Sequence, residues 1–512
     1  MSAIESAYVE PDGVARAEAE QARLKKASVL GIATNLSSQG VLFVLRFAYQ
    51  IAIARLLLPA DFGLVALTAP VIAFVAMFAD LGLSAATVQQ KEIDQAQLSF
   101  LFWANVAASV LLAGVCVAIG PLVAGFYGDD RVAGVMTALG GLIFMGGWFT
   151  QHMALLNRHM RFQSIALANV LSFIVGSAAG LVSALLGASY WAIVINQAAT
   201  SLTTMVFVWA ATRWMPGRPG PFNKMKPLLH FGGNITGFNI INFFSRTSAN
   251  ILLGRFAGEA ALGLYDRAYK LVLLPFNQIA GPFGAVVVPL LSRSQGEPDF
   301  YRRAYQRMLE TVLLLTYPGL VFMIVNSQDL IGLALGPRWE GVAPIFAILG
   351  MDAFVAPIGS SMGWLFVSQG RTREMRDYGV LGSIIFVACF VAGLPWGPQG
   401  VAAGYVVAGV IEISFLTRVG TRRGPLRGRD LAQSLAPFAL GVGVTFAASY
   451  GLQQILPSGP MSLLLQSLCA YAVFAGTLAT LPCGRRVLGH LAHQLRGLAA
   501  RIHPPKNAEP QI

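Results

Sequence analysis

The chemistry-bearing residues that stand out in this sequence are two arginines, Arg46 and Arg246, inside long apolar stretches. Each is accompanied by amide side chains at helical spacing, namely Gln39, Gln50, Asn239, Asn242 and Asn250. At 100° per residue, each polar group falls on one helix face, within about 60–80°. A guanidinium in the middle of a bilayer costs at least ~2.5 kcal/mol, so it must face water or a counter-charge. The two stripes predict either a polar cavity that offers positive charge to an anionic ligand, or arginines that pair with acids and hold helices together.

Two acidic residues and a second group of basic residues are further candidate site residues. Asp352 and Glu412 lie deep in apolar stretches, where either could accept a proton in an antiport cycle or neutralise an arginine. Arg255, Arg267 and Lys270 follow the second stripe, at the predicted outer mouth of the cavity. They could draw an anionic headgroup outward, or they could form a solvated rim.

Catalytic and metal-binding motifs are missing from the sequence. It contains no G-x-x-x-x-G-K-[ST] phosphate-binding loop and no nucleophile elbow. The four cysteines show no C-x-x-C spacing, so we expect neither a disulfide framework nor a metal site. The longest outer loop, expected around 328–341, holds only Arg338 as a base. We therefore predict a transporter with no catalytic residue and no cofactor, and not an enzyme.

The composition indicates which elements position these side chains. Of the 512 residues, 55% are hydrophobic and only 12% are charged, and the mean hydropathy is +0.62. A soluble protein carries roughly 25% charged residues, so this chain cannot cover a water-facing surface. Within lipid, helices satisfy their own backbone hydrogen bonds, and about fourteen apolar stretches reach the ~20 residues that a span needs. We therefore predict an all-α integral membrane protein with about fourteen transmembrane helices.

The basic residues predict the sidedness of the chain. When about fourteen spans are counted, most of the 36 Lys and Arg residues fall on the side that holds the N-terminus. Basic loops face the cytoplasm, so we expect both termini inside. Four tryptophans lie near the predicted interfaces, where aromatic residues gather: Trp103, Trp191, Trp339 and Trp396.

An internal repeat predicts the architecture. ARLLLPADFGL at 54–64 matches GRFAGEAALGL at 254–264, so that Gly63 corresponds to Gly263, and the same offset relates Arg46 to Arg246. Each copy holds an even number of spans, which predicts two six-helix bundles related by an axis along the membrane normal, around a central cavity. The expected parts are a cytoplasmic tail (1–27), an N-lobe with spans 1–6 (28–212), a cytoplasmic linker (213–226), a C-lobe with spans 7–12 (227–420), two accessory spans (431–482) and a basic cytoplasmic tail (483–512). Small residues such as Gly176 and Gly180 are expected to permit close helix packing.

Several strings resemble the bacterial polysaccharide-transporter family. They are ARLLLPADFGLVAL, FADLGLSAATVQQKEI, GRFAGEAALGLYDRAYKLVLLPFNQIAGP and LGPRWEGVAPIFAILG. The resemblance covers about residues 28–420 and is to the Wzx-type flippases, especially the WzxC-like group, in the superfamily that also holds MATE antiporters and the lipid II flippase. It implies two lobes that alternate between inward-open and outward-open states. Family members often rely on cationic cavity residues, a role that suits Arg46 and Arg246.

The resemblance also implies a function. The expected substrate is an oligosaccharide repeat unit linked by diphosphate to a polyprenyl carrier, flipped across the bacterial inner membrane for exopolysaccharide, capsule or O-antigen assembly. A polysaccharide polymerase and a chain-length regulator are the expected partners, and no nucleic acid is expected. The alternatives are a multidrug or other small-solute antiporter of the same superfamily, and a membrane subunit or polymerase of a glycan assembly complex.

Overall fold

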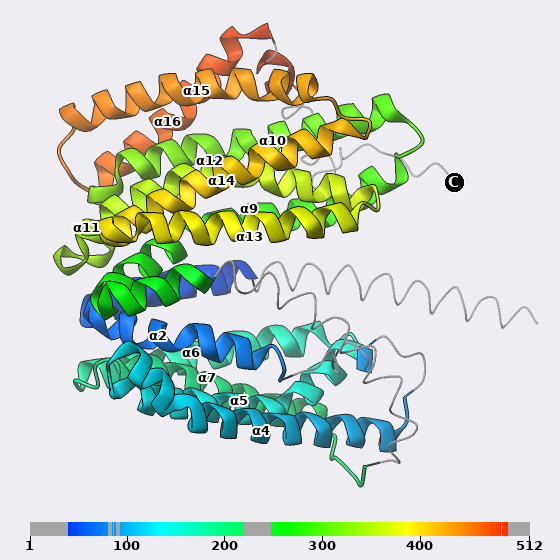
Figure 1. The fold of residues 1–512 in the computed structure, drawn as a ribbon, viewed down its shortest axis with the longest axis vertical. Helices are drawn as coiled ribbons and strands as arrows, with labels where there is room; N and C mark the ends of the chain where they lie inside the picture. Colours follow the sequence, from blue (N-terminus) through cyan, green and yellow to red (C-terminus); the bar gives the residue numbers. More distant parts are fainter. Residues whose placement is uncertain are drawn as a thin grey trace, which may run out of the picture. The chain divides into compact units, whose positions relative to one another are not determined.

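The protein is helical throughout the part of the chain that can be described. The computed structural model describes residues 39–79, 84, 87–88, 93–219, 247–482 and 484–489, apart from the side chains of 274–282, 285 and 372 (Figure 1). Within these ranges all regular secondary structure is helical, which confirms the predicted all-α class. The helices form two compact units: the chain up to Leu58 with Thr68–Ile240, and Pro59–Leu67 with Ile241–Ile512.

The first unit is a bundle of paired helices. Its members are a helix over Gln39–Leu56, the later part of α2 (Pro59–Ala76), α4 (Gln95–Tyr127), α5 (Arg131–Arg158), α6 (Phe162–Leu185) and α7 (Trp191–Thr212). α4 packs along α5, and α7 packs along both α5 and α6. The start of α4 is defined by a capping box, because Asp94 Oδ1 accepts a hydrogen bond from Gln97 N at 2.6 Å and Gln97 Oε1 accepts one from Asp94 N at 3.0 Å.

Two glycines let α6 and α7 approach each other closely, as the sequence predicts. A Cβ added at Gly176 would overlap the side chain of Thr200, and one at Gly180 would press on Asn196 and Tyr49. The helices therefore touch through backbone and small side chains, the packing typical of membrane helices.

Replacing Gly176 by leucine should destabilise the first unit. Overpacking of a tight contact costs ~1–3 kcal/mol, and the α6–α7 contact has no flexible neighbour that could absorb a whole isobutyl group. We expect a lower midpoint of thermal unfolding for purified Gly176→Leu, followed by size-exclusion chromatography after heating. Gly125→Leu is the matched control, because no atom lies within 4 Å of a Cβ added at Gly125 on α4. Equal midpoints for the two variants would contradict the predicted role of Gly176.

The second unit contains a central helix, α12, surrounded by the others. Its members are the start of α2, a helix over 247–256, α9 (Gly258–Arg293), α10 (Pro298–Val325), α11 (Ser327–Leu335), α12 (Val342–Ser368), α13 (Thr372–Gly393), α14 (Gly397–Arg422), α15 (Gly428–Ile455) and α16 (Pro460–Thr480), with 3-10 turns at Pro337–Trp339 and Leu394–Trp396. α12 packs against α9, α10 and α14, and α13 packs along α14. The segment 328–341, expected as the longest outer loop, contains most of α11 and the 3-10 turn. α11 has nine residues, too few to cross a bilayer, so the segment still connects two longer helices.

The two accessory helices, α15 and α16, pack on α10 of the second unit. At one end, Ser434 Oγ donates to Glu310 Oε1 at 2.8 Å, and Arg302 pairs with Asp430 at 3.1 Å. Further along α10, the Tyr471 hydroxyl donates to the Leu315 carbonyl at 3.1 Å. Polar contacts along α10 therefore fix the position of α15 and α16.

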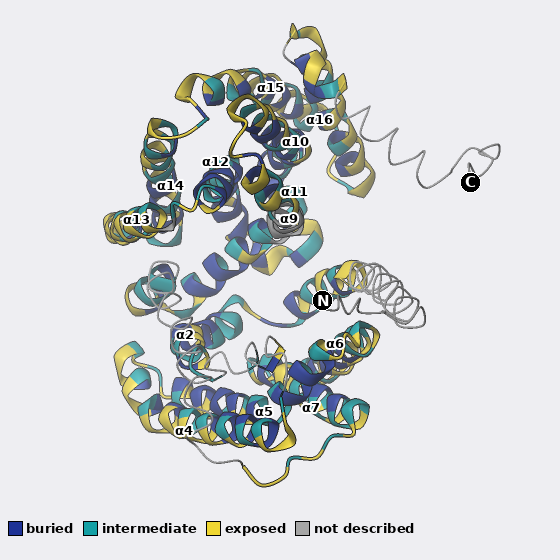
Figure 2. Cartoon of the chain, turned by 90° about the vertical axis from the view of Figure 1, so that its right-hand side faces the viewer, coloured by how far each residue is buried: buried dark blue, intermediate teal, exposed yellow. Residues whose placement is uncertain are grey.

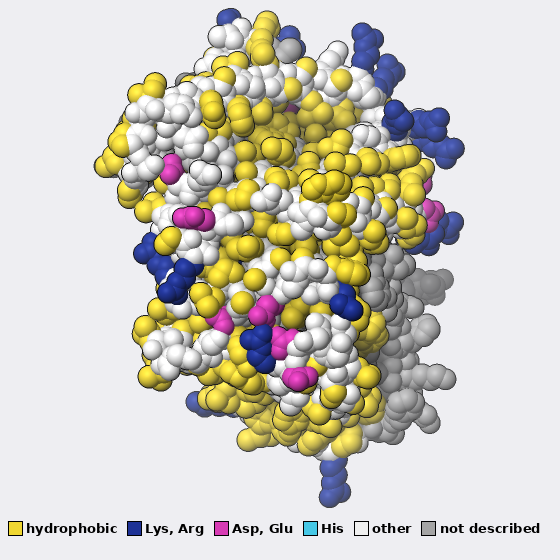
Figure 3. Space-filling view, turned by 60° about the vertical axis from the view of Figure 1, so that its left-hand side comes forward, with side chains coloured by type: hydrophobic (Ala, Val, Ile, Leu, Met, Phe, Trp, Pro, Cys, Tyr) yellow, Lys and Arg dark blue, Asp and Glu magenta, His cyan; other side chains and the backbone are white. Residues whose placement is uncertain are grey.

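The surfaces of these helices are those of a multi-pass membrane protein. Eleven helices in the described ranges are long and apolar enough to cross a bilayer. One of these, Arg373–Arg422, contains both α13 and α14, so the count of about fourteen spans stays a prediction. Figure 2 shows a buried and an exposed face along most helices, and Figure 3 shows hydrophobic side chains over much of one face, with Lys and Arg in separate groups. The exposed faces carry large apolar side chains such as Leu122, Leu186 and Ile455.

Candidate functional site

The first predicted polar stripe lies on a single helix, Gln39–Leu56. Arg46 is exposed, with its guanidinium carbon 6.0 Å from the centre of the Phe173 ring on α6. Gln39 is also exposed, and Gln50 is half-buried. A guanidinium within a membrane must face water or a counter-charge, and the role of Arg46 in lining a cavity stays a prediction.

The second stripe is only partly visible. Asn250 is half-buried on the helix over 247–256. Arg246, Asn239 and Asn242 lie outside the described residues, so the pairing of the two stripes stays a prediction.

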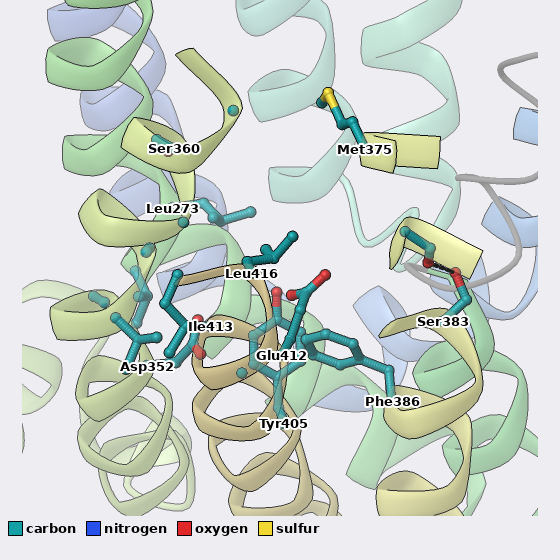
Figure 4. Close-up of a pocket in the computed structure, with 18 of the residues that line it drawn as sticks. Leu273, Asp352, Ser360, Met375, Ser383, Phe386, Tyr405, Glu412, Ile413 and Leu416 are labelled. Carbon is teal, nitrogen blue, oxygen red and sulfur yellow. Dashed lines mark hydrogen bonds between the residues drawn. The ribbon is translucent and has the colours of Figure 1, made fainter. Parts of the chain in front are cut away.

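The two predicted intramembrane acids line one cavity of about 610 Å³ inside the second unit, among α9, α12, α13 and α14. Asp352 comes from α12 and Glu412 from α14 (Figure 4). Their carboxyl groups interact electrostatically. Glycines make room for both: a Cβ at Gly409 would overlap Asp352 Oδ1, and a Cβ at Gly382 would press on Glu412 Oε1. The sequence indicated each acid separately, and the fold brings both to one cavity.

An aromatic wall, which the sequence analysis did not identify, faces the same cavity. Tyr269, Phe386 and Tyr405 all line it. The ring of Tyr405 lies 5.7 Å from that of Tyr269 and 5.1 Å from that of Phe386, centre to centre. Three helices supply these rings, so no local spacing could have indicated them. The cavity thus combines two carboxyl groups with a wall of three aromatic rings.

The three bases predicted at the outer mouth occupy three different environments. Arg255 is exposed. Lys270 forms an ion pair with Asp266 at 2.6 Å, one turn away on α9. Arg267 is buried, with only 3% of its surface exposed, and its guanidinium carbon lies 3.9 Å above the centre of the Phe62 ring.

Trp339 completes the enclosure of Arg267. Its ring centre lies 5.4 Å from the guanidinium carbon and 5.2 Å from the centre of the Phe62 ring. Trp339 is fully buried, so its ring packs inside the protein, and its predicted place near a membrane interface stays a prediction. A tryptophan suits either place, because its indole can pack on a cation as well as lie at a membrane interface.

A reciprocal backbone contact lies next to this cluster. A Cβ added at Gly63 would overlap the carbonyl of Glu259, and one added at Gly263 would overlap the carbonyl of Pro59. The repeat offset relates Gly63 to Gly263 and Pro59 to Glu259, so the two contacts are equivalent under the repeat. α2 and α9 therefore cross backbone to backbone at matched positions, within the second unit.

Comparison with known proteins identifies the family. Residues 52–344, more than half of the chain, match the family described as "Polysaccharide biosynthesis protein". The chain belongs to this family. It is 22% identical to the lipopolysaccharide biosynthesis protein WzxC of Escherichia coli (strain K12) over 85% of this chain and 89% of that protein. It is 26% identical to the teichuronic acid biosynthesis protein TuaB of Bacillus subtilis (strain 168), over 67% and 71% of the two chains.

The fold of this family member is also found among solved structures. The lipid II flippase MurJ in its inward closed conformation matches 88% of this chain and 98% of its own, with a TM-score of 0.69 and 13% sequence identity. At this identity the match demonstrates the fold alone. This fold is the one that the resemblance implies.

Proposed function

We propose that this protein flips polyprenyl-diphosphate-linked oligosaccharide units across the bacterial inner membrane, for exopolysaccharide, capsule or O-antigen assembly. The observation that carries the proposal is the family match over residues 52–344, with relatives named for lipopolysaccharide and teichuronic acid biosynthesis. The fold shared with a lipid II flippase supports the transport step. Both termini then face the cytoplasm, and a polysaccharide polymerase and a chain-length regulator would receive and use the product.

The proposed flipping needs a polar path for the head group of the substrate. A diphosphate and its sugars cannot enter hydrocarbon, whereas the polyprenyl tail can stay in lipid throughout. The Arg46 stripe would bind the head group as it passes. Its proposed counterpart consists of Arg246, Asn239, Asn242 and Asn250. An inside-negative potential favours outward movement of an anion by ~2.3 kcal/mol per charge per 100 mV.

Reconstitution tests the proposal directly. Purified protein in liposomes should move a polyprenyl-diphosphate oligosaccharide from the source organism between leaflets, measured by its exposure to an external glycosidase. A cationic drug should not accumulate in the same vesicles. Drug transport without glycolipid movement would replace the proposal by a multidrug antiporter, and chain elongation of the glycan would replace it by a polymerase.

We further propose that Asp352 and Glu412 couple flipping to protons. They share a cavity lined by aromatic side chains, so a change in protonation alters the local charge strongly. A gradient of about one pH unit supplies ~1.4 kcal/mol per proton, so it can raise the flipping rate about tenfold. Asp352→Asn and Glu412→Gln should each lose this gradient-dependent part and keep the basal rate.

The control for this prediction is Asp377→Asn, on α13. Asp377 is exposed and pairs with Arg376 at 2.8 Å, so its charge is not needed in the cavity. Its variant should respond to the gradient like wild type. An undiminished response in both cavity variants would exclude proton coupling at these two acids.

A further inference from the structure

Two arginines hold together the end of the second unit at which α14 stops. Arg371, just before α13, donates from Nη1 to the carbonyl of Arg423 at 2.6 Å and from Nη2 to that of Val419 at 3.0 Å. Arg302 on α10 donates from Nε to the carbonyl of Pro425 at 3.1 Å. The connection between α14 and α15 is therefore fixed to the starts of α10 and α13, which gives the end of α14 a defined position.

The surface at this end carries an excess of positive charge. Two of its acids are already paired with arginines, Glu374 with Arg371 at 2.7 Å and Asp430 with Arg302 at 3.1 Å. Five further arginines at this end are exposed, namely Arg418, Arg422, Arg423, Arg427 and Arg429. An anion that approaches this end of the unit is therefore attracted to it.

Two of these arginines share an exposed face of α14 with three apolar side chains. At 100° per residue, Val407, Ile411, Phe415, Arg418 and Arg422 fall within about 80° of one another. The three apolar side chains are all exposed. The stretch of membrane-spanning hydropathy that contains α14 ends at Arg422. The face thus changes from apolar to doubly basic where a span passes from lipid chains to lipid headgroups.

This exposed face is separate from the cavity of the same unit. Tyr405, Gly409 and Glu412 of α14 line that cavity. They lie about 100–160° around the helix from the centre of the exposed face. A ligand on the exposed face therefore does not enter the cavity or contact its two acids.

A second pair of exposed arginines shows what distinguishes the α14 face. Arg303 and Arg307 on α10 are also exposed and four residues apart. The helix face beyond them is covered, because Ser434 of α15 donates to Glu310 at 2.8 Å and Leu314 is buried. The α10 pair therefore offers the same charge without an exposed apolar track beside it.

We propose that the exposed face of α14 binds an anionic phospholipid, with its phosphate on Arg418 and Arg422 and an acyl chain along Phe415, Ile411 and Val407. Side chains four residues apart on a helix have their Cβ atoms ~5–6 Å from each other, so two guanidiniums can share one phosphate. The apolar track next to them buries an acyl chain, which a soluble anion lacks. This lipid belongs to the surrounding bilayer, and its site is distinct from the polar stripes proposed for the substrate.

Native mass spectrometry of the full chain tests this site. Protein in an uncharged detergent is titrated with dioleoyl phosphatidylglycerol or dioleoyl phosphatidylcholine, and the ions that retain lipid are counted. Wild type should retain phosphatidylglycerol in preference to phosphatidylcholine. The double variant Arg418→Gln/Arg422→Gln should weaken this retention about thirtyfold, equivalent to ~2 kcal/mol, because each arginine near an anionic lipid contributes about half of that. The matched control is Arg303→Gln/Arg307→Gln, which loses the same charge on α10 and should retain phosphatidylglycerol like wild type.

A second pair of measurements tests the apolar part of the site. Phe415→Ser keeps both arginines but interrupts the apolar track, and it should weaken retention of phosphatidylglycerol about tenfold. Glycerol 3-phosphate, which resembles the headgroup without its chains, should not displace the lipid even in large excess.

Several outcomes would overturn the proposal. Equal losses in the α14 and α10 double variants would show an unspecific attraction to positive charge. Undiminished retention in Phe415→Ser, or displacement by glycerol 3-phosphate, would replace the lipid by a soluble phosphate. A wild-type dimer that the α14 double variant abolishes would assign the face to a second copy of the chain. Thermal unfolding checks that each variant is folded, and Arg422→Gln alone replaces the double variant if that one is not. None of these measurements depends on glycolipid flipping.

Discussion

Replacing Arg46 or Arg246 by glutamine is expected to lower glycolipid flipping by tenfold to a hundredfold. Each variant keeps a polar side chain of similar length but loses a charge-assisted hydrogen bond to phosphate, worth ~1.5–3 kcal/mol. Arg46 is exposed on a helix of membrane-spanning hydropathy, so its charge needs a partner that the substrate can provide. The rate of glycolipid movement in proteoliposomes, at matched protein content, is the measurement.

A matched control separates the loss of charge at the cavity from loss of charge in general. Arg131 is exposed at the start of α5 and pairs with Asp129 at 2.7 Å. Its guanidinium lowers the pKa of Asp129, and Arg131→Gln should remove this effect while leaving flipping unchanged. Wild-type flipping in both Arg46→Gln and Arg246→Gln would instead assign the two arginines to a structural role.

Valine at Gly63 or Gly263 is expected to disrupt the crossing of α2 and α9 and to reduce both stability and flipping. A Cβ at either position would overlap a carbonyl of the facing helix, and backbone cannot move aside as a side chain can. Overpacking of this kind costs ~1–3 kcal/mol or more. Because the two contacts are equivalent under the repeat, the two variants should show similar losses. Thermal unfolding of the purified proteins measures the first effect, and the liposome assay measures the second.

Gly443→Val on α15 is the control for this pair. It lies in the same unit and also in a helix, but no atom lies within 4 Å of an added Cβ. It should therefore behave like wild type, apart from the small helix propensity change of valine. A stable, active Gly263→Val protein would show that α2 and α9 do not need to touch for the transport cycle.

The fold class and the individual polar residues could be predicted from the sequence because they depend on local pattern. Twenty apolar residues in a row must become a helix in lipid, whatever surrounds them. A charged residue inside such a stretch is conspicuous for the same reason, which is how Arg46, Asp352 and Glu412 were found. The repeat also indicated that Gly63 and Gly263 correspond, although it could not show that each faces the other's helix.

What surrounds each polar residue was decided by the tertiary structure. Arg267 and Lys270 are one turn apart on the same helix, yet one is enclosed by two rings and the other forms an ion pair. The ring of Phe62 reaches Arg267 across more than two hundred residues of chain, and Trp339 arrives from a third segment. Periodicity along one helix reports which face is polar, but it contains no information on which distant helix covers that face. The sequence by itself therefore determined a helical membrane protein with buried charge, and packing between distant segments decided which of those charges share a cavity, which are paired and which are covered.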